Sequence, residues 1–511
     1  MTISLILAAL FAYLCVRPIL SYLYDAKGLR RYPNVNFLAG FTSLAYVWER
    51  RRSFRTRHLY LHHQRHPILR LGPNTLSFAD PGAIKDIYGH GTPCRKDDIY
   101  TLTVGSHAHI LNVLDRDDHA RKRRMLSHAF ATRNLEHWEF KISDKINKLI
   151  AQLDRRCTLP LSVGKQVRAS DLTVNFRLWS NLFTIDALAD IALSEQLGML
   201  DSGTDTIQVD GRDGNLSYID SLRGGNNVLS HFVGATEWFS LFKTVSGFFS
   251  PRSRKQWEHG RNFGRIASAL ADKRLQRHDR GDRLSDLFAC LIEDKAGEAR
   301  CLDRGEIEAE TNLLLDAGSD TTAIALTHAL YHLLKNPHCL AKLRAEVNEA
   351  LSGDTIASYA KVKHLPYLKA CLEESLRLLP PVSRGLERRT PPEGMQILGQ
   401  MIPGDVAVSV PTYIVHRDPS LFPDPNVYRP ERWLENGEQA KQMREAFIPF
   451  SSGARGCIGR NITMMEQQIF IATLVHRYNF ALPSPDWTLD WQEAFLLWPS
   501  QMPLKIWSID D

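Results

Sequence analysis

The chain has 511 residues, of which 44% are hydrophobic and 23% are charged. This composition is typical of a globular protein with a large core, and the length suits one large domain or two average ones. The net charge of +6 is spread along the chain, so it does not indicate nucleic-acid binding. The eight cysteines stand singly, without zinc or disulfide spacing, which predicts a reduced compartment.

The N-terminal segment differs from the rest of the chain. Residues 3–24 are mostly apolar and about as long as a bilayer-spanning helix of ~20 residues. Arg17 interrupts this segment, and a basic cluster follows it, which favours an anchor with the C-terminal bulk in the cytosol. A buried helix is the alternative. We predict a membrane anchor over 1–24, a basic, proline-containing hinge over 25–35, and one globular domain over 36–511.

Short strand-like runs with turn residues between them occupy residues 68–81. The middle of the chain is mostly helical, because apolar residues recur every three or four positions in 134–156 and 328–351. Within it, the glycine-rich and polar stretch 200–227 predicts a mobile loop. Residues 380–435 hold proline, glycine and short β runs. The sequence therefore predicts a mainly α fold with small β-sheets (α+β).

Cys457 lies in a loop of small residues, just before a segment, 458–478, that is predicted to be a helix. Arg455, Arg460 and the helix start favour a thiolate, since each stabilises negative charge. One thiolate suits an iron whose other ligands are not protein, as in haem. A lone cysteine is more often a buried packing residue, so the neighbouring residues decide between the two interpretations.

Those neighbours carry a signature. Phe450, Gly453, Arg455, Cys457 and Gly459 match the pattern F-x-x-G-x-R-x-C-x-G in full. The chain thus resembles the cytochromes P-450, and the resemblance extends over nearly its whole length. It implies the P-450 fold, with a single large haem domain, one haem b, and Cys457 as the axial ligand of the haem iron.

Two further stretches resemble family motifs in the expected order. "EESLR" supplies Glu374 and Arg377, which lie three apart on one helix face, and "YRPERW" supplies Arg432. The resemblance implies that these three side chains form a buried charge network behind the haem. Without the resemblance, Glu374 and Arg377 would be interpreted as a surface ion pair, which contributes little to stability. Removal of one member from a buried network strands a charge, so we expect loss of haem incorporation.

The stretch "AGSDTT" (317–322) resembles the family's distal helix motif. The resemblance implies that Ala317 and Gly318 leave room beside the haem. It also implies catalytic roles for Asp320 and Thr321 in delivering protons to oxygen. The alternative for the threonine is a hydrogen bond from its hydroxyl to the carbonyl four residues earlier.

Residues 117–130 resemble the family helix whose tryptophan and arginine bind the haem propionates. Here His119 takes the tryptophan position, and Arg123 is the arginine. Arg455 and Arg388 are further propionate candidates, although the adjacent Arg389 leaves the register of Arg388 open. The basic run 121–124 is either part of a docking face or a solvated helix face.

The resemblance implies a monooxygenase that inserts one atom of O2 into a lipophilic or aromatic small molecule. By position in the family, the substrate contacts are expected from 101–114, 382–386, 495–498 and the distal helix, which contributes the residues Asn312, Asp316 and Ala317. Most of these residues are apolar. The haem carries the oxidation chemistry, while the protein orients the substrate and controls protons.

No flavin or NADPH motif is evident, so we expect electrons from NADPH through a membrane flavoprotein reductase, with cytochrome b5 as a further candidate partner. The expected location is the endoplasmic reticulum membrane, single-pass, with the catalytic domain in the cytosol. Residues 24–34, 81–92 and 116–130 resemble fungal microsomal members, particularly the benzoate 4-monooxygenase-like group. We expect a role in secondary metabolism, with catabolic hydroxylation of an aromatic acid as the alternative.

Two other functions compete with monooxygenation. A haem-thiolate isomerase or dehydratase would need neither oxygen nor reductase, but the retained Asp320–Thr321 pair argues against it. A haem-binding sensor or carrier without catalysis is the third hypothesis, and the complete distal motif and the predicted anchor argue against it. Dependence of turnover on NADPH and O2 separates all three.

Overall fold

The computed structural model describes residues 13, 16–162, 164–209, 214–294 and 296–509. The predicted membrane anchor falls mostly outside these residues, and only its end is seen, as α2 (Arg17–Tyr24). Within the described ranges, no helix combines the length and apolar character needed to cross a membrane.

Helices make up most of the described chain. Those before residue 280 are α2 (Arg17–Tyr24), α3 (Leu44–Glu49), α4 (Arg55–His63), α5 (Ala83–Tyr88), α6 (Arg116–Ser127), α7 (Thr132–Glu136), α8 (Glu139–Asp154), α9 (Phe176–Leu193), α10 (Met199–Ser202), α11 (Tyr218–Phe232), α12 (Phe239–Phe249) and α13 (Pro251–Asp279). The later ones are α14 (Ala289–Ile292), α15 (Arg304–Lys335), α16 (Pro337–Ala350), α17 (Tyr359–Val362), α18 (Pro366–Leu378), α19 (Thr412–Val415), α20 (Glu438–Ala446) and α21 (Arg460–Arg477).

The strands are short. They are β1 (Ile68–Gly72), β2 (Thr75–Phe78), β3 (Arg95–Lys96), β4 (Val174–Asn175), β5 (Thr206–Gln208), β6 (Asn215–Ser217), β7 (Arg388–Arg389), β8 (Met395–Ile397), β9 (Gln400–Ile402), β10 (Ala407–Ser409), β11 (Tyr478–Ala481), β12 (Trp491–Glu493), β13 (Leu497–Pro499) and β14 (Pro503–Ser508). The main sheet has the order β1-β2-β10-β7-β3, in which only β2 and β10 are parallel. A second sheet has the order β11-β14-β4, and the remaining strands form three hairpins. The prediction of a mainly helical fold with small sheets is confirmed.

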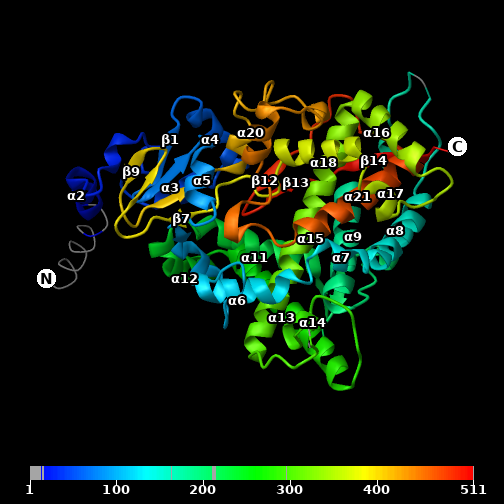
Figure 1. Cartoon of the computed structure of the whole chain (residues 1–511), viewed down its shortest axis with the longest axis horizontal. Coiled ribbons are helices and arrows are strands. Elements are labelled where there is room, and N and C mark those ends of the chain that lie inside the picture. The colour runs from blue at the N-terminus through cyan, green and yellow to red at the C-terminus, as the bar shows by residue number, and fades with distance from the viewer. Residues whose placement is uncertain (1–12, 14–15, 163, 210–213, 295, 510–511) are drawn as a thin grey trace.

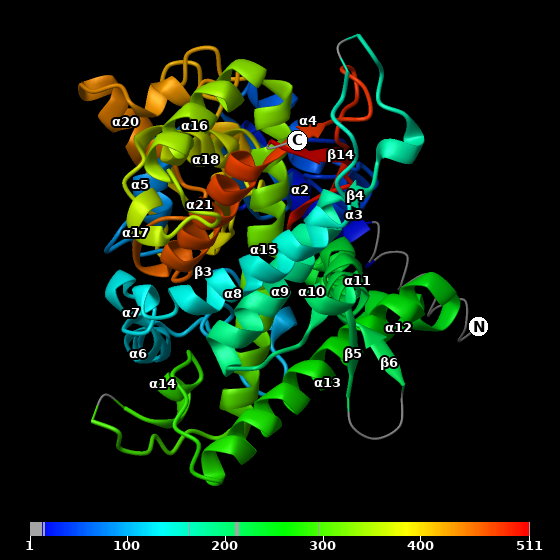
Figure 2. The ribbon, with the colours of Figure 1, turned by 90° about the vertical axis from the view of Figure 1, so that its right-hand side faces the viewer.

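The sheet-rich part lies at one end of the molecule, where early strands pair with strands from residues 388–409 (Figure 1). The long helix α15 runs through the helical part and packs along α9 (Figure 2). Asp303 caps its start, since its carboxylate accepts a hydrogen bond from the backbone N–H of Gly305. Lys335 in its last turn complements the negative end of the helix dipole.

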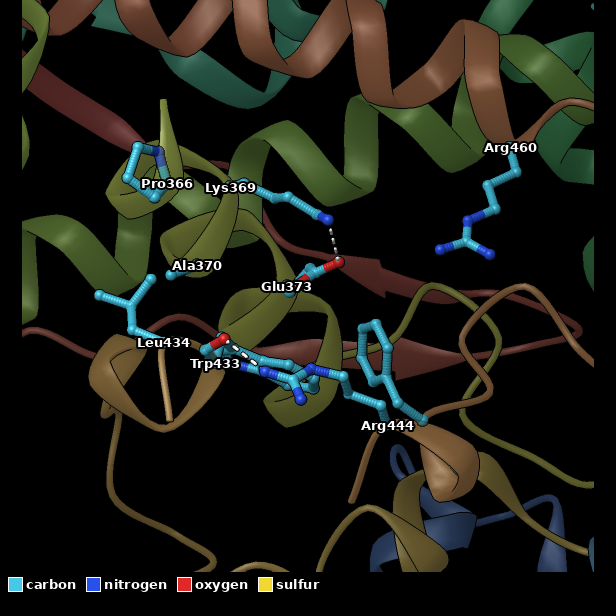
Figure 3. A pocket seen from close by; sticks show the side chains of 9 residues that line it. Pro366, Lys369, Ala370, Glu373, Trp433, Leu434, Arg444 and Arg460 are labelled. Atoms are coloured by element: carbon cyan, nitrogen blue, oxygen red, sulfur yellow. Dashed lines mark hydrogen bonds and ion pairs between the residues drawn. The ribbon is translucent and has the colours of Figure 1, made fainter. Parts of the chain in front are cut away.

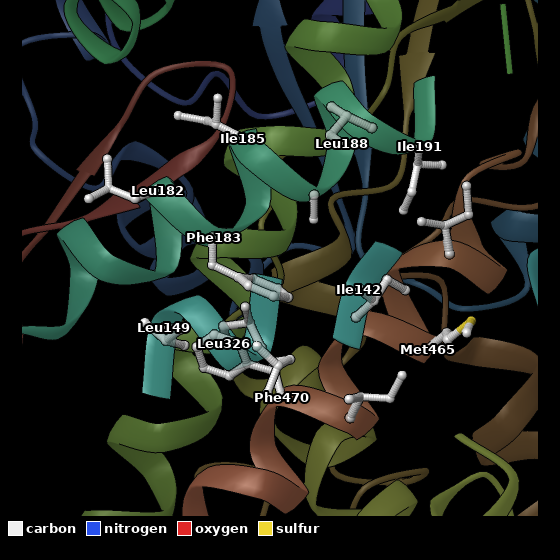
Figure 4. Close-up of a cluster of buried hydrophobic side chains, with 14 of the residues drawn as sticks. Ile142, Leu149, Leu182, Phe183, Ile185, Leu188, Ile191, Leu326, Met465 and Phe470 are labelled. Atoms are coloured by element: carbon white, nitrogen blue, oxygen red, sulfur yellow. The ribbon is translucent and has the colours of Figure 1, made fainter. Parts of the chain in front are cut away.

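The largest apolar core lies where α8, α9, α15 and α21 meet. Figure 4 shows side chains from all four helices converging, among them Ile142, Phe183, Leu326 and Phe470. Helix α9 is buried along nearly its full length, which explains why it is apolar all round and not amphipathic. This core fixes α15 and α21 relative to each other. Helix α15 carries the predicted distal motif, and α21 directly follows the loop of Cys457.

The prediction of a mobile loop over residues 200–227 is wrong for its second half. Residues 218–227 belong to α11, which packs on α13. A Cβ atom on Gly225 would lie 2.7 Å from the Cα atom of Gly260, so the two helices approach backbone to backbone at this point. The glycines therefore serve helix packing here, a tertiary cause that outweighs their low helix propensity.

Candidate active site

A cavity of about 1050 Å³ lies between α6, α11, α13, α15 and the loop before α21. Nine of the predicted site residues line it: His119, Arg123, Ala317, Gly318, Thr321, Phe450, Arg455, Cys457 and Gly459. Arg388, Gly453, Asp320, Glu374, Arg377 and Arg432 are not among its lining residues. The structure thus brings the cysteine loop and the distal motif to one space, although they are more than 130 residues apart in sequence.

The loop that carries Cys457 has a fixed shape. The backbone N–H of Cys457 donates to the carbonyl oxygen of Phe450 at 2.8 Å, and that of Gly456 donates to Gly453 at 3.0 Å. Gly453 has φ +66°, and a Cβ atom there would lie 1.9 Å from the carbonyl oxygen of Tyr88. Only glycine fits this position. The Cys457 side chain is exposed only to the cavity that it lines, and α21 begins three residues later.

The protein groups alone do not lower the pKa of Cys457. Burial raises it, and this effect outweighs the hydrogen bonds from the backbone N–H groups of Gly459 and Arg460 and the charges of Arg123 and Arg460. The prediction that the surroundings favour the thiolate is therefore wrong in its net direction, since it neglected desolvation. The stabilising groups are nonetheless present, and coordination to a metal deprotonates a thiol outright.

Basic side chains gather at one side of the cavity. We call Lys96, His119, Arg123, Arg388 and Arg455 the cationic cluster. Burial, followed by Arg388 and Arg455, lowers the pKa of Lys96 well below its usual range. Burial and the neighbouring charges also lower the pKa of Arg455 to about 10 and that of His119 to about 4.

The arginines of the cationic cluster form a surplus of positive charge, whereas His119 is neutral because its pKa is lowered. Within the described part of the chain, none of its members forms an ion pair with a carboxylate; Arg123 and Arg455 bond instead to the carbonyl oxygens of Gly456 (2.6 Å) and Val113 (2.8 Å). Buried like charges are unfavourable unless an anion joins them. The two propionates of a haem would supply two anions beside a cysteine ligand, so these residues fit that cofactor.

The strand pairing decides between Arg388 and Arg389. Arg388 is buried opposite Lys96 across β7 and β3, and its charge acts on Arg455. Arg389 instead forms ion pairs with Asp97 (2.8 Å) and Asp98 (3.2 Å). Lys96 itself was missed by the sequence analysis, because a lone lysine in a two-residue strand carries no motif.

Glu374, Arg377 and Arg432 lie together and are almost completely buried. The Arg377 guanidinium bonds both carboxylate oxygens of Glu374, at 2.8 and 2.9 Å, and Arg432 bonds Oε1 at 3.1 Å. Trp433 Nε1 adds a hydrogen bond of 2.9 Å to Oε2. Burial would raise the pKa of Glu374, but the two arginines more than offset this and lower it.

Asp320 does not face the cavity as a free proton carrier. Its carboxylate is 1% exposed and accepts hydrogen bonds from Arg177 (2.6 Å), Arg223 (2.8 Å) and Asn181 (3.0 Å). Burial alone would raise its pKa, but Arg223 and Arg177 hold it well below the usual range. Asp320 therefore ties α15 to α9 and α11 as a permanent anion.

Thr321 lines the cavity, and its hydroxyl donates to the carbonyl oxygen of Ala317 at 2.6 Å, the alternative that the sequence left open. Ala317 is exposed to the cavity. Gly318 was predicted to leave room beside the haem, but the structure gives a different reason for a glycine here. A Cβ atom at this position would lie 2.9 Å from the Leu188 side chain of α9. Close packing of α15 on α9 requires this glycine.

Glu466 of α21 is a further lining residue that the sequence analysis missed. It is 2% exposed, and burial raises its pKa to about 8, while a hydrogen bond with Thr322 lowers it. Thr322 in turn shares a hydrogen bond of 2.7 Å with Thr463. The carboxyl group is therefore mostly protonated at neutral pH, and it can hold a proton next to the distal helix. Its place nine residues after Cys457 was the available signal.

Comparison with known proteins agrees with this geometry. A family model described as Cytochrome P-450 matches residues 47–506. The chain belongs to the cytochrome P-450 family. It is 32% identical to the cytochrome P-450 monooxygenase efuB of Hormonema carpetanum, over 86% of this chain and 83% of that protein. It is 30% identical to the benzoate 4-monooxygenase bphA of Aspergillus niger, over 90% of each chain.

A third relative is the cytochrome P-450 monooxygenase cicH of Emericella nidulans, 30% identical over 92% of each chain. The prediction that this chain is a P-450 monooxygenase, an oxidoreductase, is therefore confirmed. The family's haem would be held by Cys457 on one face and by the cationic cluster at its propionates. Bound there, haem supplies the reductive activation of O2. Among the chain's own residues, Thr321 and Glu466 place hydroxyl and carboxyl protons at the cavity.

Proposed function

We propose that this P-450 monooxygenase hydroxylates a lipophilic or aromatic small molecule of fungal secondary metabolism. The observation that carries the proposal is the single cavity that joins Cys457, Thr321 and an apolar wall. That wall includes Leu188, Leu313, Val382, Leu386, Phe495 and Leu496. An extended apolar wall in such a cavity suits a lipophilic ligand, and the relatives are fungal monooxygenases.

The test is expression in microsomes together with an NADPH-dependent flavoprotein reductase. The reduced-CO difference spectrum should show the band typical of thiolate-ligated haem, and Cys457→Ser should lose it. Product formation should then require NADPH, O2 and the reductase together. Turnover without O2 would favour the isomerase or dehydratase, and absence of any product across a broad substrate panel would favour a haem-binding carrier.

The reductase, with cytochrome b5 as a second partner, is proposed to dock on the cysteine side. A second cavity of about 390 Å³ lies there, lined by Arg460, Lys369, Glu373 and Arg444 (Figure 3). Lys369 lies 3.8 Å from Glu373, whereas Arg460 forms no ion pair within the described residues and is exposed. An acidic patch on a flavoprotein would complement this basic surface.

The basic run 121–124 contributes less to such a face than its sequence indicates. Arg121 bonds Glu306 and Asp118, Lys122 is buried against Glu310 at 3.0 Å, and Arg123 lines the cavity. Arg124 alone is exposed without an ion pair among the described residues. We therefore assign a docking role to Arg124 and to the surface around Arg460.

The proposed location is the endoplasmic reticulum membrane, with the catalytic domain on the cytosolic side. One observation supports contact of the globular domain with lipid: α12 exposes Leu241, Val245, Phe248 and Phe249. The 3-10 helix Thr236–Trp238, which precedes α12, lies beside the N-terminal part of the chain, where Ser43 bonds Glu237. Deletion of residues 1–24 should weaken sedimentation with microsomes. If the deletion releases the protein completely, the segment 1–24 is the main anchor. If the protein stays with the membrane until Phe248→Ser is added, α12 is the main anchor.

Hydroxylation of an aromatic acid is the second candidate, because one relative is named a benzoate 4-monooxygenase. The acidic residue Asp316 in the lining of this chain's cavity argues against a carboxylate substrate.

A further inference from the structure

Asp316 places a carboxyl group in the cavity that the oxidation chemistry does not use. It lies on α15 immediately before Ala317 and lines the cavity together with Asn312, which is four residues earlier on the same helix face. Asn226 of α11 lines the cavity too, and its Nδ2 donates to Oδ1 of Asp316 at 3.1 Å. We call Asp316, Asn312 and Asn226 the Asp316 pole.

The Asp316 carboxylate has no counter-charge. Burial raises its pKa to about 6, the hydrogen bond from Asn226 lowers it, and the charge of Asp320 raises it further; no cation contributes. The guanidinium groups of Arg177 and Arg223 bond to Asp320, four residues later on α15, and not to Asp316. Asp316 is thus largely ionised at neutral pH, with one neutral hydrogen-bond donor.

The second oxygen of this carboxylate is open to a ligand. Among the described residues no donor reaches Oδ2, and the atom is not enclosed by protein. Two other cations of the lining are engaged elsewhere: Arg384 bonds Glu387, and Arg254 bonds the carbonyl oxygens of Gly247 and Phe248. Lys243 and Arg261 also line the cavity, and among the described residues neither forms a hydrogen bond or ion pair with Asp316. A partly desolvated anion that lacks a donor is unfavourable, so a donor brought by the ligand would be favourable here.

We propose that the Asp316 pole selects substrates that carry a hydrogen-bond donor, a hydroxyl or a protonated amine, and disfavours substrates with a carboxylate at this end of the cavity. The inference rests on the proposed function, since it assigns the substrate class of the same cavity. A protonated amine gains an ion pair with the carboxylate, a hydroxyl donates a hydrogen bond to the same anionic oxygen, and a carboxylate meets like charge.

The test uses the haem-loaded full chain in microsomes and four probes with one skeleton: 4-phenylbutanol, N,N-dimethyl-4-phenylbutylamine, 4-phenylbutyrate and butylbenzene. Dissociation constants are measured by equilibrium dialysis, which requires no turnover. For the wild type we expect the alcohol and the amine to bind about tenfold or more tightly than butylbenzene, and the carboxylate to bind most weakly.

Asp316→Leu should remove the preference for the alcohol and the amine. Asp316→Asn, nearly identical in shape, should keep the alcohol, lose the amine and admit the carboxylate, while the exposed control Asp486→Asn should leave all four constants unchanged. The proposal is overturned if the wild type binds butylbenzene or the carboxylate as tightly as the alcohol, or if Asp316→Asn leaves the ranking unchanged. Failure of the proposed function is separate, because it would appear as a missing thiolate band in the reduced-CO spectrum.

Discussion

The charge network behind the cysteine loop and the polar groups of the distal cavity are built on opposite principles. Around Glu374, every carboxylate oxygen meets an arginine or indole donor, and the group is closed to solvent. Around Asp316, one oxygen has a single neutral donor and the other has none among the described residues. The first arrangement is complete without a ligand, whereas the second is completed by one.

This contrast separates two tasks. A fully paired buried network fixes one backbone arrangement and tolerates no substitution, which suits the part of the molecule that holds a cofactor common to the family. A partly paired site keeps binding capacity for a particular ligand, which suits the part that differs among relatives. The following substitutions test whether the two sites differ in this way.

The largest effect is expected in the network. Glu374→Gln leaves Arg377 and Arg432 without their shared anion, and stranding a buried charge costs about 3–5 kcal/mol. The variant should lose both haem and most of its stability, measured as the thiolate band and as the urea midpoint. The exposed Glu438→Gln should change neither. A stable, haem-loaded Glu374→Gln protein would refute the view of a complete network.

The next effect is expected at Asp320, which belongs by its pairing to the first kind of site. Asp320→Asn leaves two arginines facing a neutral amide and should cost ~2–4 kcal/mol. Because the pKa of Asp320 is depressed, its stabilisation is present above its unfolded pKa and is lost as the pH falls. The variant should therefore differ from the wild type at pH 7 but converge with it in strong acid. Equal urea midpoints at pH 7 would show that Asp320 is free to move.

Glu466 should give a smaller effect with the opposite pH dependence. Its folded pKa of about 8 lies above the ordinary glutamate value of 4.5, so the folded state holds a proton that the unfolded state releases between these pH values. Wild-type stability should fall relative to Glu466→Gln as the pH rises from 4.5 to 8, by a few kcal/mol at most. Chemical unfolding at several pH values measures this. A constant difference between the two proteins would mean that Glu466 is ionised throughout.

The smallest effect is expected at a pair of neighbours. Arg389→Gln breaks a partly exposed pairing and should change stability by less than about 1 kcal/mol. Arg388→Gln should instead speed the loss of haem to a scavenging apo-globin, because it removes a member of the cationic cluster. Similar rates of haem loss in both variants would remove the distinction between the two arginines.

The sequence predicted the fold and the motif residues of the cavity well, because each motif is a set of residue types at fixed spacing. It predicted the three charged members of the buried network but not the fourth partner, Trp433, although this residue directly follows Arg432 in the same motif. It could not predict the ion pairs of Asp320, since Arg177 and Arg223 come from two other helices. Lys96 and Glu466 were missed for the same reason: their roles arise only where separate elements meet.

The error over residues 218–227 has a related cause. Glycine and asparagine disfavour helices in isolation, and the prediction used that local preference. In the fold, contact of Gly225 with Gly260 of α13 stabilises α11 as a helix. Tertiary packing of this kind leaves no local trace in a single sequence.

The pairing of β3 with β7 has a consequence for assembly. It sets Lys96 opposite Arg388 and Arg95 opposite Arg389, so cations face each other at the end of the main sheet. Like charges directly opposite oppose strand pairing. An anionic cofactor would bridge the inner pair and thereby close the sheet. Hydrogen exchange at the backbone of residues 95–96 should therefore slow when the chain takes up haem, so that the outermost strand of the sheet reports whether the enzyme is assembled.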